Sequence, residues 1–342
     1  MNAASALHYP FDDTPPAGTV FPVAPGIGWV RMPLPFALDH INVWLLDDGD
    51  RLAAIDSGVD TAEIRAHWDQ ALSAERRPLA RVIVTHCHPD HVGLASWLAA
   101  RDRGQVLMTL GEYFGAHAIW GQTPGYAIPD MVAQFAAHGL DDRRLAAFNE
   151  RGNTYRRGAP ELPDRYHRLF DGDRIAIGGH DWRVIVGYGH SPEHASLYCE
   201  ALGVLVSGDM LLPRISTNIS LPAAMPTGDP LGWFLDSLRA LRNLPDNTLV
   251  LPSHGRPFRG IHARVDQLIA HHRDRCDELV AACGSPRSAA ELLSTLFPRE
   301  LDTHQVMFAM GEAIAHLNHL EQQGRLRRME EGDGAIRYIT TR

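Results

Sequence analysis

Lysine is absent from the sequence: all 32 basic residues among its 342 positions are arginine. This absence excludes a Schiff-base lysine and the lysine of a Walker-type phosphate loop. Acidic residues outnumber basic ones, and the formal net charge is -9. Because neutralisation of phosphates dominates nucleic-acid affinity, this balance disfavours nucleic acid as a partner.

The sequence is also poor in cysteine and in long apolar runs. The four cysteines, at positions 87, 199, 276 and 283, form no Cys-x-x-Cys pair, which is typical of a reducing compartment and disfavours a disulfide framework. The first ten residues do not combine a basic region with an apolar one, and no apolar stretch approaches the roughly 18 residues of a membrane span. We therefore expect a cytoplasmic protein that does not bind a membrane.

The apolar pattern predicts an α/β organisation of short strands and amphipathic helices. Residues 41–57 are predicted as two strands joined by a turn at 48–50, residues 79–84 as a buried strand, and residues 61–74 and 92–100 as helices. Further strands are predicted at 106–109, 173–177, 182–188, 195–199, 204–207 and 248–251. Several strands are followed directly by a residue suited to metal binding, so we expect a site at one edge of a sheet.

Three regions are predicted along the chain: a catalytic domain at 1–260, a linking helix at 261–285 that ends in Gly284-Ser285-Pro286, and a small domain at 286–342. Within the first region, residues 111–168 are interpreted as an insertion or lid over the site. Their aromatic residues fit an acyl pocket and an ordinary core equally well. The last region has predicted helices at 288–296 and 303–323 and strands at 325–330 and 335–340 around Glu331-Gly332-Asp333-Gly334, which is typical of a winged helix. With seven arginines against eight acidic residues, we expect it to pack or dimerise rather than read DNA.

The most specific motif is Thr85-His86-Cys87-His88-Pro89-Asp90-His91, which follows the predicted strand at 79–84. Imidazole and carboxylate suit zinc, iron and manganese. His86 and His88 are two positions apart, so on an extended loop end they can point to one side. Together with His190, Asp209 and His254, the motif supplies enough ligands for two ions.

At these residues the chain resembles the metallo-beta-lactamase superfamily, through five motifs that span roughly residues 20–260. The resemblance implies a four-layer αβ/βα sandwich with a metal site at one edge of two packed sheets. It implies that the first metal is held by His86, His88 and His190, and the second by Asp90, His91 and His254. It also implies that Asp209 bridges the two metals and that Asp56 supports the site.

The chemistry that follows from this resemblance is hydrolysis by a metal-bound hydroxide. Two divalent ions are expected, zinc in the first place, with iron or manganese as alternatives. Asp90 is the candidate to orient the water and to shuttle its proton, and His194 is expected to make supporting hydrogen bonds rather than to bind metal. Asp90, Asp56 and His194 are therefore the predicted catalytic residues.

The helix after His254 and the C-terminal region resemble the lactamase-beta-2-like branch, which lies near glyoxalase II. Small esters, thioesters or lactones first, are therefore the expected substrates, with Arg214 and Arg256 as candidates to bind an anionic part of the substrate. One alternative is a single-strand endoribonuclease. Another is a non-catalytic ligand-binding or regulatory protein, which a missing metal ligand would favour. A homodimer is left open.

Overall fold

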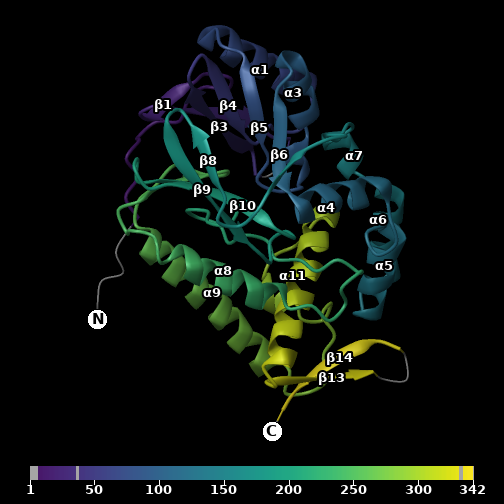
Figure 1. The fold of residues 1–342 in the computed structure, drawn as a ribbon. Coiled ribbons are helices and arrows are strands. Elements are labelled where there is room, and N and C mark those ends of the chain that lie inside the picture. The colour runs from purple at the N-terminus through teal and green to yellow at the C-terminus, as the bar shows by residue number, and fades with distance from the viewer. Residues whose placement is uncertain (1–6, 36–37, 331–333, 342) are drawn as a thin grey trace. The chain divides into compact units, whose positions relative to one another are not determined.

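The computed structural model describes residues 7–35, 38–330 and 334–341. They form two compact units (Figure 1). Unit 1 comprises Met1–Trp120, Tyr155–Thr217 and Ser237–Val265, and unit 2 comprises Gly121–Thr154, Asn218–Asp236 and Asp266–Arg342. The predicted division at 1–260, 261–285 and 286–342 stays a prediction, because these units are defined by packing and each draws on three separate parts of the chain.

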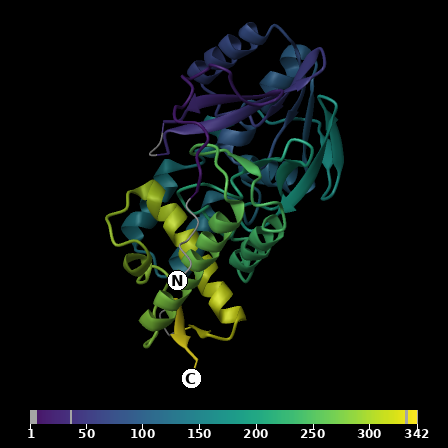
Figure 2. The same ribbon diagram turned by 90° about the vertical axis from the view of Figure 1, so that its left-hand side faces the viewer.

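Unit 1 contains two β-sheets (Figure 2). The first sheet has seven strands in sequence order, antiparallel from β1 to β4 and parallel from β4 to β7. Its strands are β1 Phe21–Ala24, β2 Ile27–Pro33, β3 His40–Asp48, β4 Arg51–Ile55, β5 Leu79–Ile83, β6 Gln105–Thr109 and β7 His167–Leu169. The second sheet has the order β12-β11-β10-β9-β8, with β11 and β12 parallel and the other pairs antiparallel. Its strands are β8 Arg174–Ile177, β9 His180–Gly187, β10 His194–Cys199, β11 Val204–Gly208 and β12 Leu249–Pro252.

Helices connect these strands and make up much of unit 2. They are α1 Ala62–Glu75, α2 Pro89–Val92, α3 Ala95–Asp102, α4 Leu110–Gly121, α5 Ile128–Ala137, α6 Asp142–Arg151, α7 Tyr155–Gly158, α8 Pro230–Leu241, α9 Ile261–Ala282, α10 Leu293–Leu296 and α11 Thr303–Gln322. Helix α1 starts after Thr61, whose side chain accepts the backbone N–H of Ile64. Among the described residues, no helix combines the length and the apolar character needed to cross a membrane.

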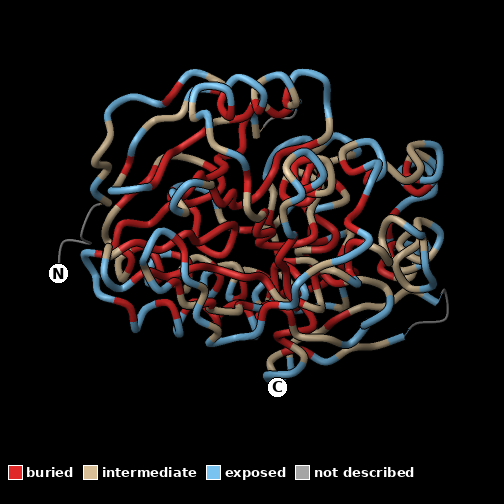
Figure 3. Tube along the Cα trace, turned by 45° about the horizontal axis from the view of Figure 1, so that its top comes forward, coloured by how far each residue is buried: buried red, intermediate tan, exposed pale blue. Residues whose placement is uncertain are grey.

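The first sheet is buried on both faces, and its alternating side chains enter two different cores. On one face Val43 and Leu45 pack in a cluster with Trp68 of α1. On the other face Trp44 packs in a cluster with Val184 of the second sheet. Unit 1 is therefore layered as helices, sheet and sheet, and buried segments are drawn red in Figure 3.

The predicted strands are present, with ends shifted by one or two residues, and the predicted α/β class is confirmed. The helix predicted at 92–100 is present as α3, shifted to Ala95–Asp102, and the short helix α2 precedes it and is separated from it by Gly93 and Leu94. A Cβ at Gly93 would lie 2.4 Å from the carbonyl oxygen of Gly158, so the chain is crowded at this break. The helix predicted at 288–296 is reduced to α10. Strands β1, β2 and β7 and helix α8 were not predicted.

Unit 2 contains α5, α6, α10, α11 and a two-stranded antiparallel sheet of β13 Leu326–Glu330 and β14 Ile336–Thr340. Helix α11 begins with a capping box, in which the Asp302 carboxylate accepts the Gln305 backbone N–H over 2.9 Å. Phe135 and Phe148 are buried and meet edge to face, so these two aromatics of 111–168 belong to a core. Of the predicted turn between β13 and β14, residues 331–333 lie outside the described residues. The winged-helix identity of 286–342 stays a prediction.

Candidate metal centre

The predicted metal ligands meet at one edge of the sheets of unit 1. His86 lies shortly after β5, Asp209 follows β11, and His254 lies shortly after β12. His190 lies in the loop that precedes β10. This edge therefore collects side chains from both sheets, as the strand-end positions predicted.

The first ligand group consists of His86, His88 and His190. The Nε2 atom of His86 lies 2.9 Å from Nδ1 of His88 and 3.2 Å from Nε2 of His190. Three imidazole nitrogens therefore converge on one point from two separate loops.

The second ligand group consists of Asp90, His91 and His254. The Oδ2 atom of Asp90 lies 3.5 Å from Nε2 of His91 and 3.5 Å from Nε2 of His254. The three ligand atoms of this group come from the loop after β5 and the loop after β12.

Asp209 lies between the two groups. Its Oδ2 is 3.5 Å from Nε2 of His190 in the first group, whereas its Oδ1 is 3.4 Å from Nε2 of His254 and 3.7 Å from Nε2 of His91 in the second. Each carboxylate oxygen thus faces a different group, which is the arrangement expected of a bridging ligand.

The donor set fits metal ions. Among the described residues, Nε2 of His91 and Oδ1 of Asp209 are buried and have no hydrogen-bond partner. A buried polar atom without a partner costs about 1–3 kcal/mol, so these two atoms need a ligand that the polypeptide does not provide. Imidazole nitrogen and carboxylate oxygen are the ligands that zinc, iron and manganese accept.

Hydrogen bonds behind three histidines direct their second nitrogen toward the centre. Nδ1 of His91 donates to Oδ2 of Asp56 over 2.8 Å, and Nδ1 of His254 donates to the carbonyl oxygen of His40 over 2.7 Å. The Thr85 hydroxyl donates to the Asp56 carboxylate, and its oxygen lies 3.0 Å from Nδ1 of His86. Each bond fixes the tautomer in which Nε2 is free to bind a cation.

Asp56 occupies a backbone conformation that is unusual for a residue with a side chain, with a φ of 62°. Its Oδ1 accepts the backbone N–H of Thr85 over 2.8 Å. The carboxylate thus joins the end of β4 to the start of the histidine motif, which agrees with a supporting position for Asp56.

His194 lies beside the centre but outside both ligand groups. Its Nε2 accepts the backbone N–H of Asp209 over 3.0 Å, so it holds the segment that carries the shared carboxylate. Gly208 makes this approach possible: it has a φ of 53°, and a Cβ there would lie 2.3 Å from Nε2 of His194. The structure thus places His194 where the sequence predicted a supporting hydrogen bond.

Metal ligands must be deprotonated, and the two ligand groups differ in this respect. Burial opposes protonation of His91 and His254, but the nearby carboxylates of Asp90 and Asp209 outweigh it and raise the pKa of both rings, so a cation at the second group would displace protons. Burial lowers the pKa of His86 well below its ordinary value and that of His88 to about 3, so both rings are neutral. Burial opposes ionisation of Asp90, but the neighbouring His91 outweighs it and the pKa of Asp90 falls to about 2. Burial likewise opposes ionisation of Asp209, and His254 and His91 bring its pKa well below the usual range.

The two predicted substrate-binding arginines have different surroundings. Arg214 is exposed. Arg256 is half-buried, and its Nη1 donates to the carbonyl oxygens of Phe11 and Asp12 over 3.3 and 3.0 Å while its guanidinium lies over the ring of Tyr9. Arg256 therefore holds the N-terminal segment, and a substrate-binding role for either arginine stays a prediction.

Sequence reasoning missed three polar residues that hold the ligand loops. His40 accepts the backbone N–H of Gly255 through Nε2 over 2.8 Å, and Asn42 donates to the carbonyl oxygens of Pro252 and Gly255. These contacts span more than 200 residues and leave no local signal. The third is Glu112, which comes soon after β6, so the rule of a polar residue after an apolar strand could have found it.

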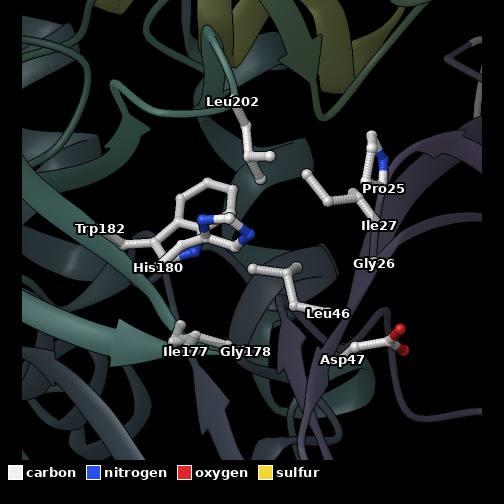
Figure 4. A pocket seen from close by; sticks show the side chains of 10 residues that line it. All are labelled: Pro25, Gly26, Ile27, Leu46, Asp47, Ile177, Gly178, His180, Trp182 and Leu202. Atoms are coloured by element: carbon white, nitrogen blue, oxygen red, sulfur yellow. The ribbon is translucent and has the colours of Figure 1, made fainter.

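A separate pocket of about 200 Å³ lies in unit 1 (Figure 4). The rings of Trp182 and His180 lie together on one side of it, and Ile27, Leu46 and Leu202 also line it. Leu46 is near the opposite end of β3 from His40, so this pocket is distant from the ligand groups.

Comparison with known proteins identifies two regions. The family described as "Metallo-beta-lactamase superfamily" matches residues 37–254, and the family described as "Metallo-beta-lactamase-like, C-terminal domain" matches residues 276–341. The probable metallo-hydrolase YqjP of Bacillus subtilis is 29% identical over 322 residues, which cover 89% of this chain and 95% of that protein. An atrochrysone carboxyl ACP thioesterase of Aspergillus aculeatus is 21% identical over 252 residues, which cover 74% of this chain and 62% of that protein.

Among solved structures, a beta-lactamase domain protein from Burkholderia ambifaria superimposes with a TM-score of 0.90 and 48% identity over 98% of both chains. The resemblance predicted from the sequence is therefore confirmed. Since the superfamily match covers most of the chain and includes both ligand groups, the protein belongs to the metallo-beta-lactamase superfamily and is a metal-dependent hydrolase of that superfamily.

Proposed function

We propose that this hydrolase is binuclear and acts on small esters, with thioesters or lactones as the preferred substrates. The observation that carries the binuclear part is Asp209, whose Oδ2 faces His190 and whose Oδ1 faces His91 and His254. A carboxylate with one oxygen toward each of two ligand groups is suited to hold two cations close together.

Each ligand group would hold one divalent ion, zinc in the first place and iron or manganese as alternatives. When bound, the ions supply Lewis acidity toward the substrate carbonyl and lower the pKa of a water. The chain contributes imidazole and carboxylate ligands at fixed positions. Because Asp56, Thr85 and His40 hold the ligand rings from behind, the rings need little reorganisation when substrate binds.

Asp90 is placed to handle the proton of the attacking water. Its side chain is 20% exposed, whereas those of His91 and His254 are 0% and 3% exposed. With a pKa of about 2, its carboxylate is ionised at neutral pH and can accept a hydrogen bond from the water. We propose that Asp90 orients the water and receives its proton at the solvent-facing side of the centre.

Three observations support an ester substrate. A relative that matches 74% of this chain is named as a carrier-protein thioesterase. The net charge of -9 is unfavourable for a phosphodiester backbone. The exposed guanidinium of Arg214 suits an anionic tail on a small acyl substrate.

The test combines metal analysis with a substrate panel. Metal content per chain would be measured by mass spectrometry, and turnover would be measured with thioester, lactone and single-stranded RNA substrates. His88→Ala is the disabling variant. His180→Ala, at the separate pocket of Figure 4, is the matched control.

In the wild type and in His180→Ala we expect two metals per chain and hydrolysis of thioester or lactone. Only His88→Ala should lose a metal and the activity. Fewer than one metal per chain, or full activity in His88→Ala, would contradict the metal centre. Cleavage of RNA without hydrolysis of thioesters or lactones would replace the ester proposal with an endoribonuclease.

A further inference from the structure

A buried carboxylate takes no part in the mechanism above. Glu112, in the first turn of α4, has a relative exposure of 0%. Its Oε2 accepts the backbone N–H of Cys87 over 2.8 Å. Its Oε1 accepts the hydroxyl of Ser191 and the backbone N–H of Glu193, both over 2.6 Å. One side chain thus binds two loops that are about a hundred residues apart in the sequence.

These two loops carry the first ligand group. Cys87 lies between His86 and His88, and Ser191 directly follows His190. Every ligand of that group is therefore within one residue of a donor to Glu112. The distance of 3.2 Å between Nε2 of His86 and Nε2 of His190 depends on how these loops are spaced, whereas the 2.9 Å between His86 and His88 lies within one loop.

The second ligand group is held by other residues. The Asp56 carboxylate fixes His91, and the carbonyl oxygen of His40 fixes His254. Among the described residues, no hydrogen bond joins Glu112 to this group. Glu112 therefore contacts only the loops of the first group, whereas Thr85, which bonds to Asp56, lies beside both His86 and His91. The two groups meet at Asp209.

Further contacts fix α4 against the loop after His190. The Glu193 carboxylate accepts the backbone N–H of Gly111 over 2.8 Å, and the Thr109 hydroxyl donates to the Glu193 carbonyl oxygen over 2.7 Å. The helix approaches closely because it has glycine at the contact: a Cβ at Gly111 would lie 2.9 Å from Cγ of Glu193. Glu112 is therefore held in a rigid position from which it can set the loops.

The chemistry of the site requires an acceptor with two oxygens. Two of its three partners are backbone N–H groups, which can only donate. Burial raises the pKa of Glu112, and the bonds from Ser191, Glu193 and Cys87 oppose that effect. The single oxygen of a glutamine could accept the bonds from Ser191 and Glu193. The NH2 group would then face the N–H of Cys87, and the hydrogen bond to the His86–His88 loop would be lost.

We infer that Glu112 is a positioning residue that sets the geometry of the first metal position, formed by His86, His88 and His190, and leaves the second position to other supports. The inference rests on the metal centre of the proposed function but not on the choice of substrate. Loss of an outer hydrogen-bond partner of metal ligands typically costs about 10- to 100-fold in metal affinity.

The test follows metal binding directly. Full-length protein is stripped of metal with a chelator and titrated with Co²⁺, whose visible absorption reports ligand geometry. The variants are Glu112→Gln and Glu112→Ala. The control is Asp102→Asn, which alters a carboxylate that accepts the backbone N–H of Leu79 at the opposite end of β5. Thermal unfolding of each stripped protein reports folding separately.

We expect two binding events in the wild type and in Asp102→Asn. In Glu112→Gln one event should weaken by about 10- to 100-fold with an altered spectrum, while the other is retained. Wild-type affinities and spectrum in folded Glu112→Gln, or equal weakening of both events, would overturn the inference. If the wild type binds two Co²⁺ ions but hydrolyses no ester, the ester proposal fails, and the role of Glu112 is still decided by the titrations.

Discussion

His91 and Asp56 share a hydrogen bond of 2.8 Å between Nδ1 and Oδ2, and both side chains are at most 1% exposed. Because an ionised carboxylate can only accept, the proton lies on Nδ1 and Nε2 is directed toward Asp90 and Asp209. A residue 35 positions earlier in the chain thus fixes both the tautomer and the direction of a predicted ligand.

Asp56→Asn should weaken metal binding at the second position. Asparagine tolerates the φ of 62° at this position, so the substitution isolates the carboxylate from the backbone. An amide has one acceptor oxygen and cannot serve both the Thr85 N–H and His91 as the carboxylate does. We expect a loss of about 10- to 100-fold in affinity, measured by metal titration. Unchanged affinity would show that His91 does not need this support.

Gly208→Ala should disturb the centre through His194. A Cβ at Gly208 would lie 2.3 Å from Nε2 of His194, which accepts the Asp209 N–H. Gly203 is a matched control, since its φ of 62° is similar and nothing lies within 4 Å of a Cβ there. Gly203→Ala should cost about 1 kcal/mol of unfolding free energy from backbone strain.

The Gly208→Ala variant should lose more stability than this control and should also bind metal less tightly. Denaturant unfolding and metal titration of both variants measure the two effects. Equal stability losses with unchanged metal binding would rule out the contact with His194 as a constraint on the site.

The sequence allowed prediction of the residues whose signal is local. Asp56, His86 and Asp209 each come soon after an apolar strand, and that strand-end position marks them as candidates for one common site. The β3–β4 hairpin could be predicted because its signal, the turn at 48–50 between two apolar strands, is also local. In these cases the pattern and the structure depend on the same few neighbouring residues.

Residues whose partners are distant could not be predicted in this way. His40 and Asn42 support the loop of His254, and nothing near them in the sequence indicates a contact 213–215 residues away. Strands β1 and β2 were missed because glycine and proline interrupt them and their turn, although pairing with β3 stabilises β2. Tertiary hydrogen bonds there outweigh a weak local preference.

Unit 2 should lose stability in mild acid because of a buried histidine pair. His272 and His316 lie 3.2 Å apart between Nδ1 and Nε2, and burial lowers the pKa of His272 to about 2 and that of His316 to about 4. Nδ1 of His316 donates to the Glu312 carbonyl oxygen, a bond that favours the protonated ring, but burial outweighs it. A histidine in the unfolded chain has a pKa near 6.5. Below that pH, His272 and His316 therefore bind protons in the unfolded chain but not in the folded one. Stability is therefore complete above about pH 6.5 and falls as the pH approaches 4.

His316→Gln should reduce this dependence. Removing one such group lowers the slope of unfolding free energy between pH 4.5 and 6 by about 1.4 kcal/mol per pH unit. The Glu312 carboxyl acts in the opposite direction, because burial raises its pKa to about 7, but it is present in both proteins and does not affect the difference. Urea unfolding across this range provides the slopes, with His180→Gln as the control. Parallel slopes for wild type and His316→Gln would contradict the prediction.

The last prediction separates the two arginines that were predicted to bind substrate. Arg256 already binds the carbonyl oxygens of Phe11 and Asp12, so Arg256→Ala should cost about 1 kcal/mol of stability and leave KM nearly unchanged. Arg214 is exposed, so Arg214→Ala should not alter stability.

If Arg214 binds an anionic tail of the substrate, Arg214→Ala raises KM for a carboxylated thioester by about tenfold, the effect of roughly 1.4 kcal/mol, and leaves KM for an uncharged thioester as it was. Comparing the two substrates therefore isolates the charge. Equal changes in KM for the carboxylated and the uncharged thioester would show that Arg214 does not bind the charged tail. A rise in KM for Arg256→Ala without loss of stability would indicate that Arg256 binds the substrate instead.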